Sequence, residues 1–211
     1  GKPAREWLNE LAAFGIGVWQ FLPLAPTDSF GSPYSSPSSF ALNPWFLDQN
    51  DLVRDGFLAN NLEDFSSAND CFKNRVDFHL ANSKVKSLRF SLVDYWYKQN
   101  RTIQEEFEIW CSKQFWLDDH SIFMELKIQN NDLPWWEWPD EYAGRDKKEL
   151  ENWKKNNQKE LLGHKLLQWH LDRQWQSIRE LAKNLGIYLF GDVPFYVSKD
   201  SADVWSNRSL F

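Results

Sequence analysis

The chain is poor in cysteine and has no excess of positive charge. Its 211 residues contain two cysteines, Cys71 and Cys111, which form no CxxC pair and match no metal-ligand spacing. A disulfide-framed fold is therefore excluded, and a reducing compartment, by default the cytoplasm, is expected. Lys and Arg number 24 against 30 Asp and Glu, which gives a net charge of −6 at pH 7. Because no basic cluster stands alone, we expect no nucleic-acid partner and no membrane partner.

Several motifs that carry common chemistry are also missing. No apolar run approaches the roughly 20 residues of a membrane span, and the N-terminus has no signal-peptide core. The pair Gly15 and Gly17 comes before an expected strand, which is the reverse of a dinucleotide-binding loop, and no phosphate-loop lysine is present. The histidines form no i,i+4 pair, so we expect no metal site. They are His79, His120, His164 and His170.

Tryptophan, in contrast, is abundant, with 13 copies in a chain whose aromatic content is 17%. Flat aromatic rings stack on the apolar faces of sugars, so a surplus of aromatics beyond core filling points to carbohydrate. Trp on amphipathic helices, such as Trp7, Trp169 and Trp175, is better explained as core. Loop tryptophans are the better candidates for sugar stacking. We take four rings as candidates: Trp135, Trp136, Trp138 and Trp205.

Two segments share one order of elements. Near the N-terminus, a helix over residues 3–14 with one apolar face ends at Gly15, and a buried strand over 18–22 runs into a long polar loop. Near the C-terminus, a second helix is followed by Gly186, an apolar run to Phe190 and another loop. Two strands that are each preceded by a helix favour a parallel α/β fold. In such folds the carboxyl ends of the strands carry the chemistry, and either a barrel or an open doubly wound sheet fits this pattern.

The middle of the chain differs from both ends. Residues 59–76 are polar and irregular, and from about 79 to 130 we expect two helical segments. Two prolines then bracket a Trp-rich stretch, and a charged stretch leads into the long helix that ends near residue 185. We therefore divide the chain into three parts. They are a barrel segment over residues 1–58, a helix-rich insertion over 59–158 and a second barrel segment over 159–211.

Asp192 and Tyr34 are the leading polar candidates in the two loops. Asp192 follows the second strand, so its carboxylate should project into any pocket at the strand ends, and it is either an acceptor for a sugar hydroxyl or a structural cap. Tyr34 lies in a turn-forming stretch and should offer an exposed phenol. Further on, we expect Asp200 or Ser201 to cap a short helix that has Asp203 in its first turn.

Several motifs carry a family resemblance. They are Trp19 to Thr27, Gly31 to Ser36, Asn43-Pro44, Leu133-Pro134-Trp135 with Trp138-Pro139, Gln168-Trp169 with Gln174-Trp175, Gly186 to Val197, and Asp200 to Trp205. In this order they are similar to the 4-α-glucanotransferases, also called amylomaltases or disproportionating enzymes, of glycoside hydrolase family 77. The motifs span nearly the whole chain. Departures from the family pattern are mild and affect the loops, at Ala25, Leu42 and Ser198.

The resemblance implies a cofactor-free retaining transglycosylase that cuts α-1,4-glucans and maltooligosaccharides and passes the piece to another glucan. It implies a (β/α)8 barrel of which this chain holds about strands 2 and 3, with the helical middle as an insertion. By the same resemblance, Tyr34 contacts the sugar next to the scissile bond, Ser32 and Pro33 shape its loop, Asp192 holds the innermost donor subsite, and Asn43 belongs to the same site. The compartment would be the plastid stroma if the source were a plant or an alga.

Retention of configuration requires two carboxylates about 5 Å apart, one a nucleophile and one an acid/base. The resemblance places both beyond Phe211 and the opening strand before Gly1, so we expect no catalytic residue in this segment and no disproportionation by it alone. Two rival functions stay open. One is an α-glucan hydrolase of the same clan, which would make no product longer than its substrate. The other is a non-catalytic glucan-binding module, which the aromatics favour and the strand-end aspartate disfavours.

Overall fold

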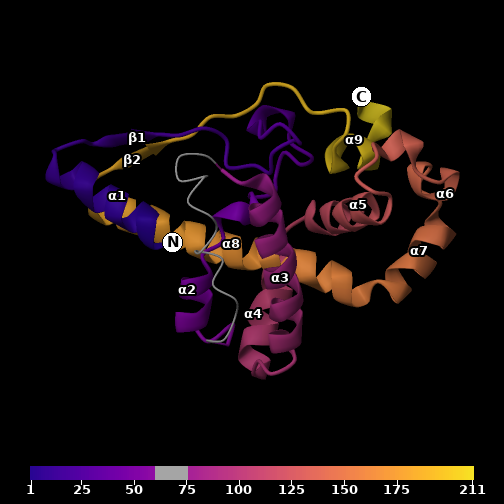
Figure 1. Cartoon of the computed structure of the whole chain (residues 1–211), viewed down its shortest axis with the longest axis horizontal. Coiled ribbons are helices and arrows are strands. Elements are labelled where there is room, and N and C mark those ends of the chain that lie inside the picture. The colour runs from indigo at the N-terminus through magenta and orange to yellow at the C-terminus, as the bar shows by residue number, and fades with distance from the viewer. Residues whose placement is uncertain (60–75) are drawn as a thin grey trace.

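The two helix-to-strand units lie side by side in the computed structural model, which describes residues 1–59 and 76–211 (Figure 1). Helix α1 (Lys2–Ala13) leads into strand β1 (Val18–Gln20), and helix α8 (Gln158–Asn184) leads into strand β2 (Tyr188–Phe190). The strands pair in parallel. Over the described ranges they form a two-stranded sheet in a structure that is otherwise helical.

Helices make up most of the remaining structure. The longer ones are α3 (Phe78–Trp96), α4 (Arg101–Ser112), α5 (Leu117–Gln129) and α7 (Lys147–Asn156). Short helices are α2 (Gln49–Arg54), α6 (Asp140–Ala143) and α9 (Ala202–Ser206). Single 3-10 turns are η1 (Pro33–Ser35), η2 (Pro44–Phe46), η5 (Trp135–Glu137) and η6 (Arg208–Leu210). Among the residues that the structure describes, no helix is both long and apolar enough to cross a membrane.

Helices α1 and α8 end in the same way. Gly15 and Gly186 both adopt φ of +72°, a left-handed conformation that glycine reaches without strain. After α1, the amide of Ile16 donates to the carbonyl of Leu11, and after α8 the amide of Ile187 donates to Ala182 in the same pattern. The glycine amides donate as well, Gly15 to the carbonyl of Ala12 and Gly186 to that of Lys183. Two such bonds close each helix and reverse the chain, so a strand can follow each glycine.

The sheet has one covered face and one exposed face. Trp19 and Leu189, which lie opposite each other, pack against a core formed by α1 and α8. Side chains alternate between the two faces of a strand, so Val18, Tyr188 and Phe190 point the other way, and all three are exposed.

Helix α8 crosses the molecule from beside α7 to the two-stranded sheet and joins the cores (Figure 1). Its first half contributes Leu166, Leu167 and Trp169 to a cluster with α3 and α4, while its second half contributes Ile178 and Ala182 to the cluster under the sheet. The expected division of the chain at residue 158 stays a prediction. Helix α8 begins at that residue, and it packs against the parts of the chain on both sides of the division.

The helical middle has one more helix than expected. Where two helical segments were predicted between residues 79 and 130, the structure has α3, α4 and α5. Asn100 explains the first break because its side chain accepts a hydrogen bond from the amide of Ile103 and so starts α4. Asn157 lies between α7 and α8, and its side chain donates back to the carbonyl of Trp153 in α7 instead of capping α8. The polar stretch predicted as a boundary lies outside the described residues over 60–75.

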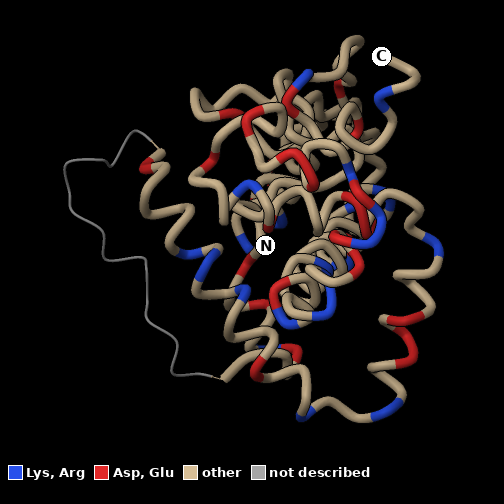
Figure 2. The backbone as a smooth tube through the Cα atoms, turned by 90° about the vertical axis from the view of Figure 1, so that its right-hand side faces the viewer, with Lys and Arg blue, Asp and Glu red and all other residues tan. Residues whose placement is uncertain are grey.

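Three buried polar side chains join the middle helices. Arg89 of α3 lies 2.5 Å from the carboxylate of Glu125 on α5, and His164 of α8 lies within 3.0 Å of the same carboxylate. Gly163 leaves room for this arrangement, since a Cβ there would sit 2.6 Å from the Cγ of Arg89. Elsewhere, acidic and basic residues are interspersed along the chain (Figure 2).

Candidate functional site

The loops that follow β1 and β2 meet at one hydrogen bond. The phenol of Tyr34 donates to Oδ2 of Asp192 over 2.6 Å, although 158 positions separate the two residues. Tyr34 comes from the 3-10 turn η1, and Asp192 lies two residues beyond the end of β2. The parallel pairing of the strands brings their carboxyl ends to the same edge, so both loops start from neighbouring points.

A compact turn presents Tyr34. Asp28 Oδ1 accepts hydrogen bonds of 2.9 Å from the amides of Phe30 and Ser32, and Gly31 between them has a φ of +84°. Ser32 then caps the 3-10 turn, because its hydroxyl accepts from the amide of Tyr34. Asp28 was missed in the sequence reading, although an aspartate two to four residues before a glycine and a serine is a signal for this kind of turn.

The next part of the first loop is fixed by serine hydroxyls. Ser36 donates to the carbonyl of Ser38 over 2.7 Å, and the hydroxyl of Ser38 accepts from the amides of Phe40 and Ala41. Both serines are buried. In a helix or a sheet, backbone amides bond to other backbone groups. Here the serine hydroxyls take that role, so these loop amides still have hydrogen-bond partners.

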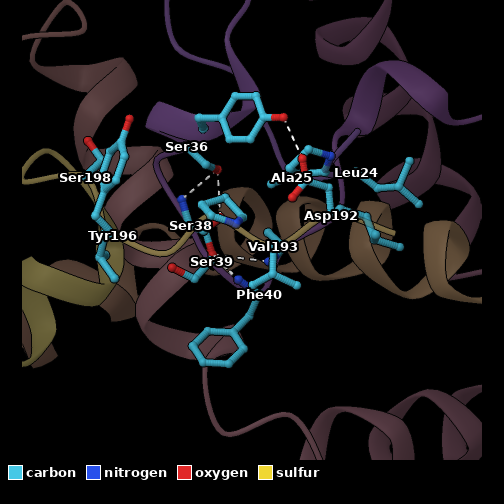
Figure 3. Close-up of a pocket in the computed structure, with 16 residues that line it drawn as sticks. Leu24, Ala25, Ser36, Ser38, Ser39, Phe40, Asp192, Val193, Tyr196 and Ser198 are labelled. Carbon is cyan, nitrogen blue, oxygen red and sulfur yellow. Dashed lines mark hydrogen bonds between the residues drawn. The ribbon is translucent and has the colours of Figure 1, made fainter. Parts of the chain in front are cut away.

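The two loops enclose a cavity of about 200 Å³. Both loops line this cavity, with residues 23–25 and part of 34–42 from the first loop and part of 192–198 from the second. Figure 3 shows Tyr196 and Ser198 on one side and Leu24 and Asp192 on the other, with Ser36 and Ser38 between them in this view. A cavity bounded by hydroxyls, a carboxylate and aromatic rings offers both hydrogen bonds and apolar contact to a ligand.

The Tyr34–Asp192 contact sets the proton state of the site. The hydrogen bond to the carboxylate raises the pKa of Tyr34 above its ordinary value, because the protonated phenol is the form that donates. A tyrosine is protonated at neutral pH in any case, and the raised pKa extends the donating form to higher pH. Asp192 is exposed and has a second carboxylate oxygen besides the one that accepts from Tyr34. Within residues 1–59 and 76–211, no three His, Cys, Asp or Glu side chains converge as ligands for a metal ion would.

The structure separates the other predicted residues of the first loop. Pro33 is the first residue of η1 and Ser32 is its cap, so both shape the turn that carries Tyr34. Asn43 is different. It is only 3% exposed, and its side chain accepts from the amide of Trp45 to cap the next 3-10 turn. The structure thus gives Asn43 a role in the loop, and its contact with substrate stays a prediction.

The four candidate stacking rings fall into two pairs. Trp138 and Trp205 are 4% and 0% exposed and belong to the core beside α5, where the indole of Trp205 donates to the carbonyl of Tyr142. Neither can present a face to a sugar, so the prediction for these two is wrong. Trp135 and Trp136 lie on η5 near the surface, and Trp136 is 42% exposed.

The second loop is anchored at its far end. Ser201 caps α9 by accepting from the amide of Val204, as expected, and Asp203 lies in the first turn. Asp200 instead accepts a hydrogen bond of 2.5 Å from Lys127 of α5 and another from the backbone of Trp135. This link between α5 and the loop was not predicted, because nothing local in the sequence pairs positions 127 and 200.

Comparison with known proteins agrees with the sequence resemblance. The family model described as 4-alpha-glucanotransferase, glycoside hydrolase family 77, matches residues 1–211. A 4-alpha-glucanotransferase of a Synechocystis strain is 36% identical over the whole chain, and that of Thermus thermophilus is 35% identical. A chloroplastic/amyloplastic 4-alpha-glucanotransferase of Arabidopsis thaliana is 31% identical.

A solved structure is similar as well. The amylomaltase from Streptococcus agalactiae, determined in complex with acarbose, superimposes on the whole chain with a TM-score of 0.89 at 26% sequence identity. The chain covers 42% of that structure and 41–42% of the Thermus and Synechocystis relatives. It thus spans about two fifths of the length of these proteins. The chain belongs to glycoside hydrolase family 77, the 4-alpha-glucanotransferases.

Proposed function

We propose that the protein transfers segments of α-1,4-glucan between maltooligosaccharides by a retaining double displacement, and that this chain supplies walls of the donor site. The hydrogen bond between Tyr34 and Asp192, at the mouth of a cavity built from both strand-end loops, is the observation that carries the proposal. Family membership along the whole chain supports the same reaction. The matched structure was solved with acarbose bound, which supports a sugar-like ligand for this fold.

In this proposal the two loops act on one sugar unit. The free lone pairs of Tyr34 accept from a sugar hydroxyl, and the ring offers an apolar face to the sugar. The second carboxylate oxygen of Asp192 accepts from another hydroxyl, while Ser32 and Pro33 hold the turn in place. We also propose that Trp136, with Trp135 beside it, stacks on a more distant unit of the glucan. Lys199 covers part of the Trp136 ring, with Nζ 4.2 Å from its centre.

The proposal extends to the architecture. We infer that β1 and β2 are about the second and third strands of a (β/α)8 barrel, with the helices between them as an insertion. Their parallel pairing and the two preceding helices support this. The two catalytic carboxylates would come from the part of the relatives' length that this chain does not span, so no residue here is assigned to bond cleavage. We propose no cofactor and a cytoplasmic or plastid-stromal location.

Product analysis with the full-length protein tests the reaction. Incubation with maltotriose should release glucose together with maltopentaose and longer chains, because a donor that loses one glucose passes a maltosyl unit to a second maltotriose. A hydrolase of the same clan would give products no longer than maltotriose, and a binding module would give none. Either result would contradict the proposed transfer.

A binding experiment tests the site apart from the chemistry. Maltoheptaose should quench or enhance the intrinsic tryptophan fluorescence of the protein, and Tyr34→Ala should weaken the affinity. An unchanged affinity would remove Tyr34 from the site.

A further inference from the structure

Two glutamine side chains of α8 clamp the backbone of the first loop. The amide of Gln168 accepts from the backbone N–H of Leu42 and donates to the carbonyl of the same residue, with both distances 2.9 Å. Gln174 makes the same pair of bonds with Asp48, again at 2.9 Å. Each primary amide therefore takes the place of a neighbouring strand for one loop residue. The clamps are six residues apart on the helix and six residues apart on the loop.

The two clamps hold different parts of the loop. Leu42, held by Gln168, lines the cavity that contains Tyr34 and Asp192. Asp48, held by Gln174, lies outside that lining and caps α2 by accepting from the amides of Asn50 and Asp51. The chain thus contains two equivalent clamps, of which one touches the wall of the candidate site and one does not.

The Gln168 clamp reaches the cavity along a second path. Next to Leu42, the backbone amide of Asn43 donates to the carbonyl of Leu24 over 2.8 Å, and Leu24 lines the cavity just after β1. Gln168 itself is only 4% exposed and sits on a helix that is packed on both halves. A rigid helix therefore fixes the position of two stretches of the cavity wall through one side chain.

We propose that Gln168 is a positioning residue of the sugar site, which holds Leu42 and, through Asn43, Leu24 at the spacing that the glucan requires. This inference rests on the proposed glucan transfer. Gln168 touches no ligand, so its loss acts through the cavity wall. Substrate positioning is sensitive to displacements of about 1 Å. Removal of the clamp should therefore weaken substrate binding as well as folding.

The test compares Gln168→Met with Gln174→Met in the full-length protein. Methionine has nearly the length of glutamine but neither donates nor accepts strongly, so each variant loses the same two hydrogen bonds to the backbone. We expect a similar fall in Tm for both, and a KM for maltotriose that rises about tenfold in Gln168→Met with a smaller change in kcat. In Gln174→Met the KM should match that of the parent.

Gln168→Glu gives an independent readout that does not need the methionine variant to fold. A carboxylate still accepts from the amide of Leu42 but cannot donate to its carbonyl, whereas the protonated carboxyl can do both. Burial raises the pKa of such a group. We therefore expect the KM of Gln168→Glu, relative to that of the parent at each pH, to fall as the pH is lowered from about 8 to 5.

The outcomes separate the two proposals. A parent protein that makes no chain longer than maltotriose overturns the proposed function and this inference with it. A parent that disproportionates maltotriose, with KM unchanged or raised equally in both methionine variants, overturns the inference alone and leaves Gln168 as a structural residue. A KM ratio for Gln168→Glu that does not vary with pH does the same.

Discussion

The backbone amide of Ser39 donates a hydrogen bond of 2.9 Å to the carboxylate of Asp203, which lies in the first turn of α9. Next to it, the amide of Ala202 donates to the carbonyl of Pro37 over 2.9 Å. These bonds join the first loop to the far end of the second. The Tyr34–Asp192 bond is therefore one of several cross-links between the loops, and both walls of the cavity are fixed relative to each other.

The Tyr34–Asp192 bond predicts how two substitutions affect binding and ionisation. Tyr34→Phe keeps the ring and removes the hydroxyl, so the affinity for maltoheptaose should fall about five- to tenfold, less than in Tyr34→Ala. Asp192→Ala removes the acceptor of this hydrogen bond, so the pKa of Tyr34 should move back toward its ordinary value. Fluorescence titration measures the first effect, and NMR-monitored pH titration of the tyrosine ring measures the second. A Tyr34 that titrates identically in Asp192→Ala contradicts the assigned cause of the shift.

Glu125 predicts an acid-sensitive contribution to stability. Burial alone would raise its pKa, but the hydrogen bond with His164 and the charge of Arg89 outweigh burial and hold the pKa at about 2, below the usual 4.5. A lowered pKa stabilises the fold above the unfolded value, and this stabilisation is lost as the pH falls from about 4.5 toward 2. Glu125→Gln leaves Arg89 without its counter-charge and should cost about 3–5 kcal/mol at pH 7.

Urea unfolding of the parent and Glu125→Gln at pH 7 and pH 3 checks this prediction. The gap in the free energy of unfolding should be smaller at pH 3, where the parent is already losing the contribution. Burial lowers the pKa of His164 below its ordinary value, so protonation of this residue in the unfolded chain also destabilises the fold below about pH 6.5. The test therefore uses the gap between parent and variant at each pH and not the stability of either one alone. A gap of equal size at both pH values would show that the carboxylate is not the group responsible.

Gly163 predicts a packing defect from a single methyl group. Alanine is the better helix former by about 1 kcal/mol, but a Cβ at this position would lie 2.6 Å from Cγ of Arg89 and 3.3 Å from Cγ2 of Val93. Arg89 cannot easily move away because it is bonded to Glu125 and His164. Gly163→Ala should therefore lower the free energy of unfolding by about 1–3 kcal/mol in spite of its helix propensity.

Gly17→Ala is the matched control for Gly163→Ala. A Cβ on Gly17 meets no atom within 4 Å, and its backbone is not in the left-handed region. Its unfolding midpoint should stay close to that of the parent in the same denaturant titration. Equal stability of the two alanine variants would contradict the crowding at Gly163.

The buried Trp205 and the exposed Trp136 predict different losses of stability when each is replaced by alanine. Trp205→Ala removes a side chain that is 0% exposed from the core beside α5, and should cost about 3–5 kcal/mol of stability. Trp136→Ala changes an exposed ring and should alter stability by about 0.5 kcal/mol or less. If Trp136 stacks on glucan as proposed, its variant alone should combine near-normal thermal unfolding with weaker binding of maltoheptaose. Calorimetry of both variants and a glucan titration of Trp136→Ala check this.

Local signals predicted the two helix-to-strand units because residues close together in the sequence determine where each helix ends and where the next strand begins. Gly15 and Gly186 mark the helix ends through a conformation that favours glycine, and the apolar runs after them predict strands. The prediction of a buried strand as far as residue 22 is wrong, because β1 ends at Gln20 and one of its faces is exposed. Tyr34 and Asp192 could be placed at strand ends for the same reason. Their hydrogen bond could not be predicted, because it depends on the register of Trp19 opposite Leu189 and on the path of two loops.

Interpretation of the loops failed where a side chain had two physically equivalent choices. The ring of Trp138 could lie against solvent or turn inward, and its proline-flanked sequence is compatible with both. It packs on Phe123 in the core. The extra helix between residues 79 and 130 was missed because Asn100 acts as a cap, a role that composition alone does not distinguish from a helical asparagine.

Because α8 is one continuous helix, a change in the number of its residues rotates all later side chains about the helix axis. Each residue of an α-helix advances the side-chain direction by about 100°. Leu171 faces the core shared with α3 and α4, and Ile178 faces the core under the sheet, on one unbroken helix of 27 residues. Inserting or deleting one residue between them would swing the α1 face away from its partner by that angle while leaving every local sequence pattern intact. Between these two positions, substitutions can be absorbed one at a time, but a change in length cannot.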